Sequence, residues 1–178
     1  MEEKPRSVSS NALWFGMITG AVMILYHLIL FLAGLYTSKT LGYIGYLFMI
    51  GGMVWGTLEY RKKYLNGFMP YSKAFVSCFM IGLFGGLLLA VYMFVFVRFI
   101  HPGYIQEMMD ISRQTMYSTN PNMSEEQIEQ AVEMSSKFMS PAMIAVSTFI
   151  GYAIASVVIA LIAAIFVKKE DKSAEPLV

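Results

Sequence analysis

The sequence predicts an all-α integral membrane protein, a four-helix bundle with an acidic extracytoplasmic helical hairpin between its third and fourth spans. The first observation behind this fold class is composition: 57% of the 178 residues are hydrophobic and 14% are charged, whereas soluble domains carry roughly 25% charged residues. The second observation is a set of four long apolar runs. Each run approaches or exceeds the ~20 residues that a helix needs to cross a bilayer.

The apolar runs define the expected domain organisation. We expect spans at about 12–36, 41–58, 74–99 and 142–167 and an outer helical hairpin at about 101–140. These segments form one membrane domain, 12–167, between an N-terminal tail, 1–11, and a C-terminal tail, 168–178. The first run is longer than the apolar region of a secretory signal, so we expect it to be retained as a helix.

The distribution of Lys and Arg predicts the orientation. Cations accumulate in short loops on the cytoplasmic side of a membrane. The expected spans place nine cations on one side, namely Lys4, Arg6, Arg61, Lys62, Lys63, Lys73, Lys168, Lys169 and Lys172. The other side holds four, namely Lys39, Arg98, Arg113 and Lys137. Both termini and the loop at 61–73 are therefore expected in the cytoplasm, with a turn at Asn66-Gly67 and a new helix from Pro70.

The segment between the third and fourth spans carries its own helix signals. Pro102 suits the first turn of a helix that runs to about Ser118. Ser124 and Gln127 have the spacing of a capping box, which predicts a second helix to about Met139. Six carboxylates against Arg113 and Lys137 give this segment a charge of −4, from Glu107, Asp110, Glu125, Glu126, Glu129 and Glu133.

Small residues at helical spacing predict how the spans pack. Helices in lipid associate closely where a missing side chain lets two backbones approach. We expect this role for glycines in all four spans, namely Gly16, Gly20, Gly52, Gly56, Gly82, Gly86 and Gly151.

The polar candidates are few. His27 is the one ionisable side chain expected deep within a span, where it is either a functional group or a hydrogen-bonded structural one. We also expect a binding site for lipid or a partner at Glu59, Arg61, Lys62, Lys63 and Arg98. The alternative is that these cations only set the orientation and that Glu59 forms a plain ion pair with them.

Catalytic, metal and nucleic-acid signals are missing from the sequence. No GxGxxG, GxxxxGK, HExxH, GxSxG or CxxC pattern occurs, and Cys78 is the single cysteine. We therefore predict no catalytic residues, no metal and no cofactor. A net charge of +1 and the lack of a basic, aromatic-rich stripe argue against nucleic-acid binding.

One segment carries a family resemblance. The text "YRKKYLNGFMPYSKAF" running into "GLFGGLLLA" resembles the bacterial, Bacteroidota-type membrane family catalogued as domain of unknown function 4199, over residues 11–167. Many members of that family carry Gly-Gly where this chain has Asn66-Gly67. The resemblance implies a bacterial inner membrane and no catalytic residues. It also hints at an accessory role near a membrane glycosyltransferase of the polyprenyl-phosphate type.

Two main functions compete at this stage, and a membrane enzyme that acts on a lipid through Glu59, His27 and Arg98 is a third. The first is a small non-enzymatic multi-pass protein that acts as a scaffold or accessory subunit for a membrane partner. The second is a carrier or flippase for a lipid-linked or small amphiphilic substrate, which with four spans requires a dimer. The expected partners are membrane lipids and either a second copy of the chain or another membrane protein. A carrier is expected to show a polar cavity near the bilayer midplane.

Overall fold

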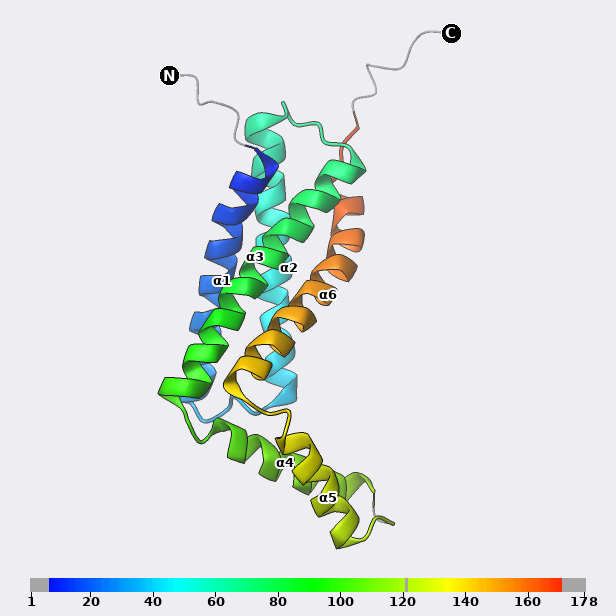
Figure 1. The fold of residues 1–178 in the computed structure, drawn as a ribbon. Helices are drawn as coiled ribbons and strands as arrows, with labels where there is room; N and C mark the ends of the chain where they lie inside the picture. The colour runs from blue at the N-terminus through cyan, green and yellow to red at the C-terminus, as the bar shows by residue number, and fades with distance from the viewer. Residues whose placement is uncertain (1–6, 121, 171–178) are drawn as a thin grey trace. The chain divides into compact units, whose positions relative to one another are not determined.

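The computed structural model describes residues 7–120 and 122–170. Its elements are α1 (Val8–Leu32), α2 (Lys39–Tyr64), α3 (Tyr71–Val95), a short π-helical segment η1 (Phe96–Ile100), α4 (Tyr104–Thr119), α5 (Glu125–Ser136) and α6 (Pro141–Val167) (Figure 1). The part of the chain that the structure describes contains no strand beyond one isolated bridge, between Met69 and Lys169. The all-helical prediction is confirmed.

The chain divides into two compact units. Unit 1 comprises Met1–Leu89 and Phe149–Val178, and unit 2 comprises Ala90–Thr148. In unit 1, α1 and α2 run beside the first part of α3 and the second part of α6, which makes a four-helix bundle. Unit 2 contains the end of α3, η1, α4, α5 and the start of α6.

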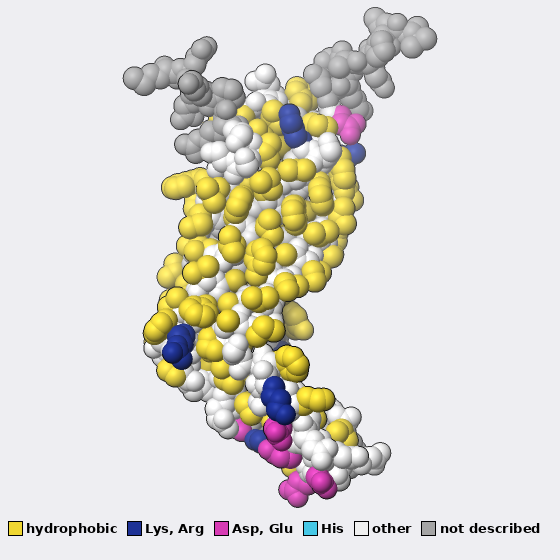
Figure 2. Space-filling model, viewed as in Figure 1, with side chains coloured by type: hydrophobic (Ala, Val, Ile, Leu, Met, Phe, Trp, Pro, Cys, Tyr) yellow, Lys and Arg dark blue, Asp and Glu magenta, His cyan; other side chains and the backbone are white. Residues whose placement is uncertain are grey.

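Four helices are long and apolar enough to cross a membrane. They are Val8–Leu32, Lys39–Tyr64, Tyr71–Ile100 and Pro141–Val167, with 25 to 30 residues each. A span needs about 20 residues. Hydrophobic side chains cover most of the visible surface of the bundle in Figure 2, and many of them are exposed, as lipid-facing residues are. The four predicted spans therefore match four observed helices.

Helix α1 ends earlier than the sequence prediction of 36. Gly34 has a φ of +69°, and Leu35 N–H donates to the Leu30 carbonyl at 2.8 Å. Gly34 N–H donates to the Phe31 carbonyl at 3.0 Å. These two bonds form a Schellman motif, which closes a helix where glycine adopts a left-handed conformation. The predicted end at 36 was based on the length of the apolar run, which does not reveal this stop signal.

Helix α2 continues further than predicted, to Tyr64 instead of 58. Arg61, Lys62 and Lys63 therefore form its last turn, and the expectation that they lie in a loop is wrong. Lys and Arg are good helix formers, and their charge favours the negative C-terminal end of the helix dipole. The connection to α3 is only residues 65–70. Its predicted turn is confirmed, since Asn66 and Gly67 have φ values of +50° and +84°.

Glycines bring the helices of unit 1 into close contact. A Cβ on Gly16 would lie 2.9 Å from the Ile81 carbonyl oxygen, and one on Gly20 would lie 3.0 Å from the Gly85 carbonyl oxygen. The backbones of α1 and α3 thus approach directly. Across the bundle, Gly82 faces Ser156, and a Cβ on Gly86 would lie 2.7 Å from Tyr152 Cβ.

Glycines of α2 also take part in these contacts. Of the seven glycines predicted to pack between helices, one on α6 does not. Gly52 faces Thr19, and a Cβ on Gly56 would lie 2.6 Å from the Phe15 ring. Gly151 is the exception, because it is exposed and nothing lies within 4 Å of its Cβ position. Helix α6 instead turns Ser156, Ala160 and Ala164 inward, so the packing prediction for Gly151 is corrected.

Hydrogen bonds between helices add to this packing. The Asn11 side chain donates to the Gly56 carbonyl at 3.1 Å, and the Thr57 hydroxyl donates to Ser77 Oγ at 3.0 Å. Such bonds between helices contribute about 0.6 kcal/mol on average in membrane proteins. Asn11, Thr57 and Ser77 were not singled out from the sequence, whereas Gly56 was predicted to take part in helix packing.

In unit 2, the predicted capping box at Ser124 and Gln127 is confirmed and begins α5. Arg113 of α4 makes a two-pronged ion pair with Glu129 of α5, with both N···O distances at 3.1 Å. Arg113 also reaches Asp110 at 2.7 Å. Ser140 caps α6 by accepting a hydrogen bond from Met143 N–H at 3.2 Å.

Some sequence predictions concern residues outside the described part of the chain. Lys4, Arg6 and Lys172 lie there, as do most of the two predicted tails. Helix α1 begins at Val8, so the last five residues of the predicted N-terminal tail are helical or cap the helix: Ser7 Oγ accepts from Ser10 N–H at 3.2 Å.

Candidate functional site at the basic end of unit 1

We call one end of unit 1 the basic end. It is formed by the last turn of α2, residues 65–70, the first turn of α3 and the end of α6. Its described cations are Arg61, Lys62, Lys63, Lys73, Lys168 and Lys169. A buried apolar cluster lies beneath them, made of Tyr60, Met69, Ala74, Ala164 and Val167. Val8 at the start of α1 packs against the same cluster, so the start of α1 and the end of α6 lie at this end (Figure 1).

Arg61 connects three parts of the basic end. Its Nη1 donates to the Val167 carbonyl at the end of α6, and its own carbonyl accepts from Gly67 N–H at 3.0 Å. The last carbonyls of a helix have no partner within the helix and carry its negative dipole charge, so a guanidinium is well placed there. Arg61 Nε is buried and has no hydrogen-bond partner among the described residues.

The connection at 65–70 is held by backbone pairing. Met69 N–H donates to the Lys169 carbonyl at 2.7 Å, and Lys169 N–H donates to the Met69 carbonyl at 2.9 Å. A residue before proline favours extended backbone, and Met69 precedes Pro70. Lys169 Nζ lies 5.4 Å from the centre of the Phe68 ring, a cation–π contact. The end of α6 is thus fixed to the connection between α2 and α3.

The other predicted site residues at this end differ in their pairing. Lys63 Nζ lies 3.4 Å from Glu59 one turn earlier on α2. This geometry agrees with the plain ion pair that the sequence left open for Glu59. Lys62 is exposed and has no ion pair among the described residues. Glu59, Arg61, Lys62 and Lys63 are therefore brought together on one helix turn.

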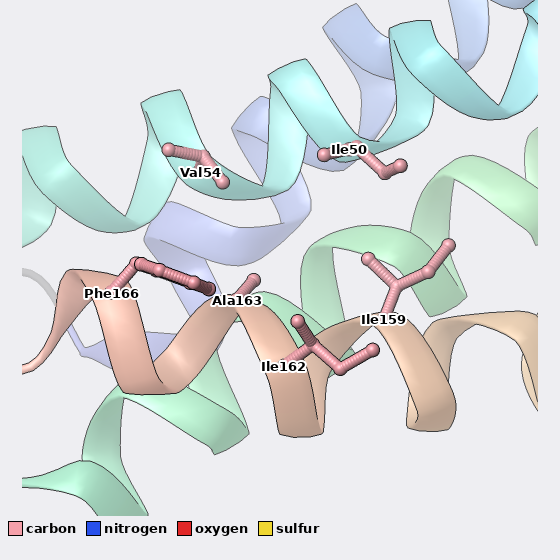
Figure 3. Close-up of a pocket in the computed structure, with 6 residues that line it drawn as sticks. All are labelled: Ile50, Val54, Ile159, Ile162, Ala163 and Phe166. Atoms are coloured by element: carbon pink, nitrogen blue, oxygen red, sulfur yellow. The ribbon is translucent and has the colours of Figure 1, made fainter.

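A groove lies between α2 and α6 below the basic end. It has a volume of about 310 Å³ and is lined by apolar side chains, Ile50, Val54, Ile159, Ile162, Ala163 and Phe166. Figure 3 shows the α2 and α6 side chains on either side of the gap between the two helices. This groove was not predicted from the sequence, because it depends on which faces of α2 and α6 meet.

His27 lies elsewhere in unit 1. It is five residues before the end of α1 at Leu32, about 7.5 Å along the axis at 1.5 Å per residue. Its half-buried ring is 6.5 Å from the Tyr36 ring, measured between centres. Because α1 ends before residue 36, His27 lies closer to the end of its helix than the predicted span placed it. Val8 lies at the basic end, about 28 Å from His27 along α1.

Arg98 belongs to unit 2. It is exposed in η1, between the end of α3 and His101. His101 Nε2 lies 3.1 Å from Glu107 of α4. Burial and the neighbouring Glu107 raise the pKa of Tyr104, whose ring contacts Phe96. In unit 2 the contacts join Phe96, His101, Tyr104 and Glu107, and Arg98 is not among the groups that unit 1 gathers at its basic end.

The described residues include no group of three or more His, Cys, Asp or Glu side chains arranged to hold a metal ion. Cys78 is buried, and its sulfur lies 3.3 Å from the Thr57 hydroxyl. The chemistry of the basic end is therefore that of cations next to an apolar groove, which suits binding of an amphiphile with a negative charge.

Comparison with known proteins gives one family. No curated protein and no solved structure matches the chain significantly. The family model described as "Protein of unknown function (DUF4199)" matches residues 14–169. Because this match covers most of the 178 residues, the chain belongs to the DUF4199 family, in agreement with the resemblance of its 60–75 segment.

Proposed function

We propose that this protein is a small non-enzymatic membrane protein that serves as a scaffold or accessory subunit for a membrane partner. In this proposal it resides in a bacterial inner membrane with both termini and the basic end in the cytoplasm. The acidic α4–α5 segment then lies outside. The partner suggested by the family resemblance is a glycosyltransferase of the polyprenyl-phosphate type.

The observation that carries the proposal is the close packing of the helices in unit 1. Met49, Met53 and Ile81 are completely buried where the helices meet, and the glycine contacts bring backbones close enough to leave little space. A carrier binds its substrate in a polar cavity near the middle of the membrane. The apolar α2–α6 groove lacks the polar groups that such a cavity needs.

The positions of the titratable candidates also support a non-enzymatic role. Acid, base and nucleophile must converge on one reacting atom. Glu59 lies at the basic end, as does Val8 at the start of α1, whereas His27 lies near the opposite end of α1, about 28 Å from Val8 along the helix axis. These two groups do not converge.

Cross-linking in the native membrane tests the proposal. A photoactivatable residue is placed at Lys62 on the basic end and, separately, at Phe138 after α5, which is exposed. Ile165, a lipid-facing residue of α6, is the control position. We expect one discrete protein adduct from Lys62 or Phe138 in stoichiometric yield, and loss of that partner's stability or activity when the chain is deleted.

The carrier alternative gives a different pattern. Lipid adducts alone at all three positions, together with transfer of a fluorescent lipid across vesicles by the purified chain, would contradict the scaffold role. Transfer is measured by reduction of the fluorescent headgroup from outside the vesicles. Empty vesicles and vesicles with an unrelated four-span protein are the controls.

A further inference from the structure

The α2–α6 groove leads directly to the basic end. Ile50 and Val54 are one turn apart on α2, and Arg61 is seven residues beyond Val54. Seven residues return to nearly the same helix face, about 10.5 Å further along the axis. On α6, Phe166 of the groove precedes Val167, whose carbonyl accepts the hydrogen bond from Arg61. The apolar groove and the guanidinium therefore belong to one continuous surface.

The charges at this end are unbalanced. Its six described cations face two described carboxylates, Glu59 and Glu170. Glu59 pairs with Lys63 at 3.4 Å, and Glu170 pairs with Lys168 at 3.5 Å. Lys62 has no ion pair among the described residues, and Arg61 uses its guanidinium on a neutral carbonyl. The excess positive charge is complementary to a phosphate, which arginine binds well through its planar fork of donors.

The lining of the groove suits a hydrocarbon chain. The groove has a volume of about 310 Å³, and each of the six residues that line it is apolar. Its apolar walls suit an acyl chain that lies along α2 and α6 with its headgroup at the basic end.

We propose that the basic end and the α2–α6 groove together bind one anionic phospholipid. Its phosphate lies at Arg61 and Lys62, and one acyl chain lies between Val54 and Ile162. This site needs no protein partner, so lipid binding can be confirmed or excluded independently of the scaffold role.

Native mass spectrometry of the purified full chain tests this site. The protein is kept in a neutral detergent, and dioleoyl phosphatidylglycerol or dioleoyl phosphatidylcholine is added. We expect the first phosphatidylglycerol to bind at least about five-fold more tightly, the factor that corresponds to the roughly 1 kcal/mol from one cation near an anionic surface. Arg61→Gln and Lys62→Gln are each expected to reduce this preference, and Arg98→Gln, in unit 2, is expected to leave it unchanged.

A matched pair of variants tests the groove. Ile162 lines the groove and Ile165 does not, and both side chains are 56% exposed. We expect Ile162→Trp to weaken the binding of the first phosphatidylglycerol several-fold, because the indole blocks the chain. Ile165→Trp is expected to bind as the wild type does.

Three results would overturn the proposal. The first is equal affinity of the wild type for the two lipids. The second is an unchanged preference in Lys62→Gln, which decides the headgroup position if Arg61→Gln does not fold. The third is equal lipid binding by the two tryptophan variants. If, in addition, Ile162→Trp alone disrupts a dimer while lipid binding persists, the groove belongs to a second copy of the chain.

Discussion

Gly86 and Gly151 are both helical glycines of unit 1, yet their surroundings are opposite. A Cβ on Gly86 would lie 2.7 Å from Tyr152 Cβ, whereas nothing lies within 4 Å of the Cβ position of Gly151. The sequence assigned both to helix packing, because each sits at the expected spacing in an apolar run. Spacing identifies a face of small residues, but only the rotation of the helix in the bundle decides where that face points.

The Gly86→Leu and Gly151→Leu variants test this difference. We expect Gly86→Leu to destabilise the protein by about 1–3 kcal/mol, since the added side chain must displace Tyr152. Gly151→Leu is expected to be neutral or to stabilise by up to about 1 kcal/mol, because leucine is the better helix former. Thermal unfolding in the same detergent measures both changes. Equal stability of the two variants would show that Gly86 does not sit at a tight contact.

At the scale of elements, sequence signals predicted most helices but missed some of their ends. The capping box of α5 follows from local residues and was predicted correctly, and the start of α6 at Pro141 lies one residue before the predicted start of the fourth span at about 142. The end of α1 was not predicted correctly, although Gly34 supplies a local stop signal. The α2 C-terminus was placed too early, because charged residues were read as loop when they can extend a helix beyond the bilayer core.

Gly34→Ala tests the stop signal of α1. Gly34 has a φ of +69° with open space around it, so the cost of alanine is backbone strain and not a clash. We expect a loss of about 1 kcal/mol in unfolding free energy. Gly42→Ala is the control, because Gly42 is helical with equally open surroundings, and it is expected to gain about 0.5 kcal/mol. A neutral Gly34→Ala would mean that α1 does not end in a left-handed turn.

The contact between α4 and α5 depends on charge. Arg113 bridges Asp110 and Glu129 in an exposed position. The hydrogen bond and negative charge of Glu129 raise the pKa of Arg113 above its ordinary value. Exposed ion pairs weaken as salt screens them. We therefore expect amide hydrogen exchange in α5 to accelerate between about 0.05 and 1 M salt, and Arg113→Gln to show the fast rate already at low salt.

Lys137→Gln is the control for Arg113→Gln. Lys137 pairs only with Glu133 of the preceding turn, so its loss leaves the contact between α4 and α5 intact. Exchange that does not respond to salt or to Arg113→Gln would mean that apolar contacts, such as those of the buried Ile128 and Val132, suffice to hold α5.

At the scale of the whole molecule, composition and run length were enough to predict four long apolar helices. The distribution of Lys and Arg was enough to predict that cations gather near residues 61–73. The site required long-range information. The Arg61–Val167 hydrogen bond joins residues 106 positions apart, and the Met69–Lys169 bridge joins residues that no local pattern relates. The groove between α2 and α6 arises from the same pairing. Such contacts depend on which helices become neighbours, and a single sequence carries little signal for that choice.

The proposed topology has four spans, with the basic end in the cytoplasm and the α4–α5 segment outside. Labelling of single cysteines at Lys63 and Asn122 with a membrane-impermeant thiol reagent tests it most directly. The host is a bacterium, and the native Cys78, which is buried, is replaced by alanine. Asn122 should react in intact cells, and Lys63 should react only in inverted membrane vesicles. Reaction at Lys63 in intact cells, with Asn122 protected, would invert the topology and contradict the claim.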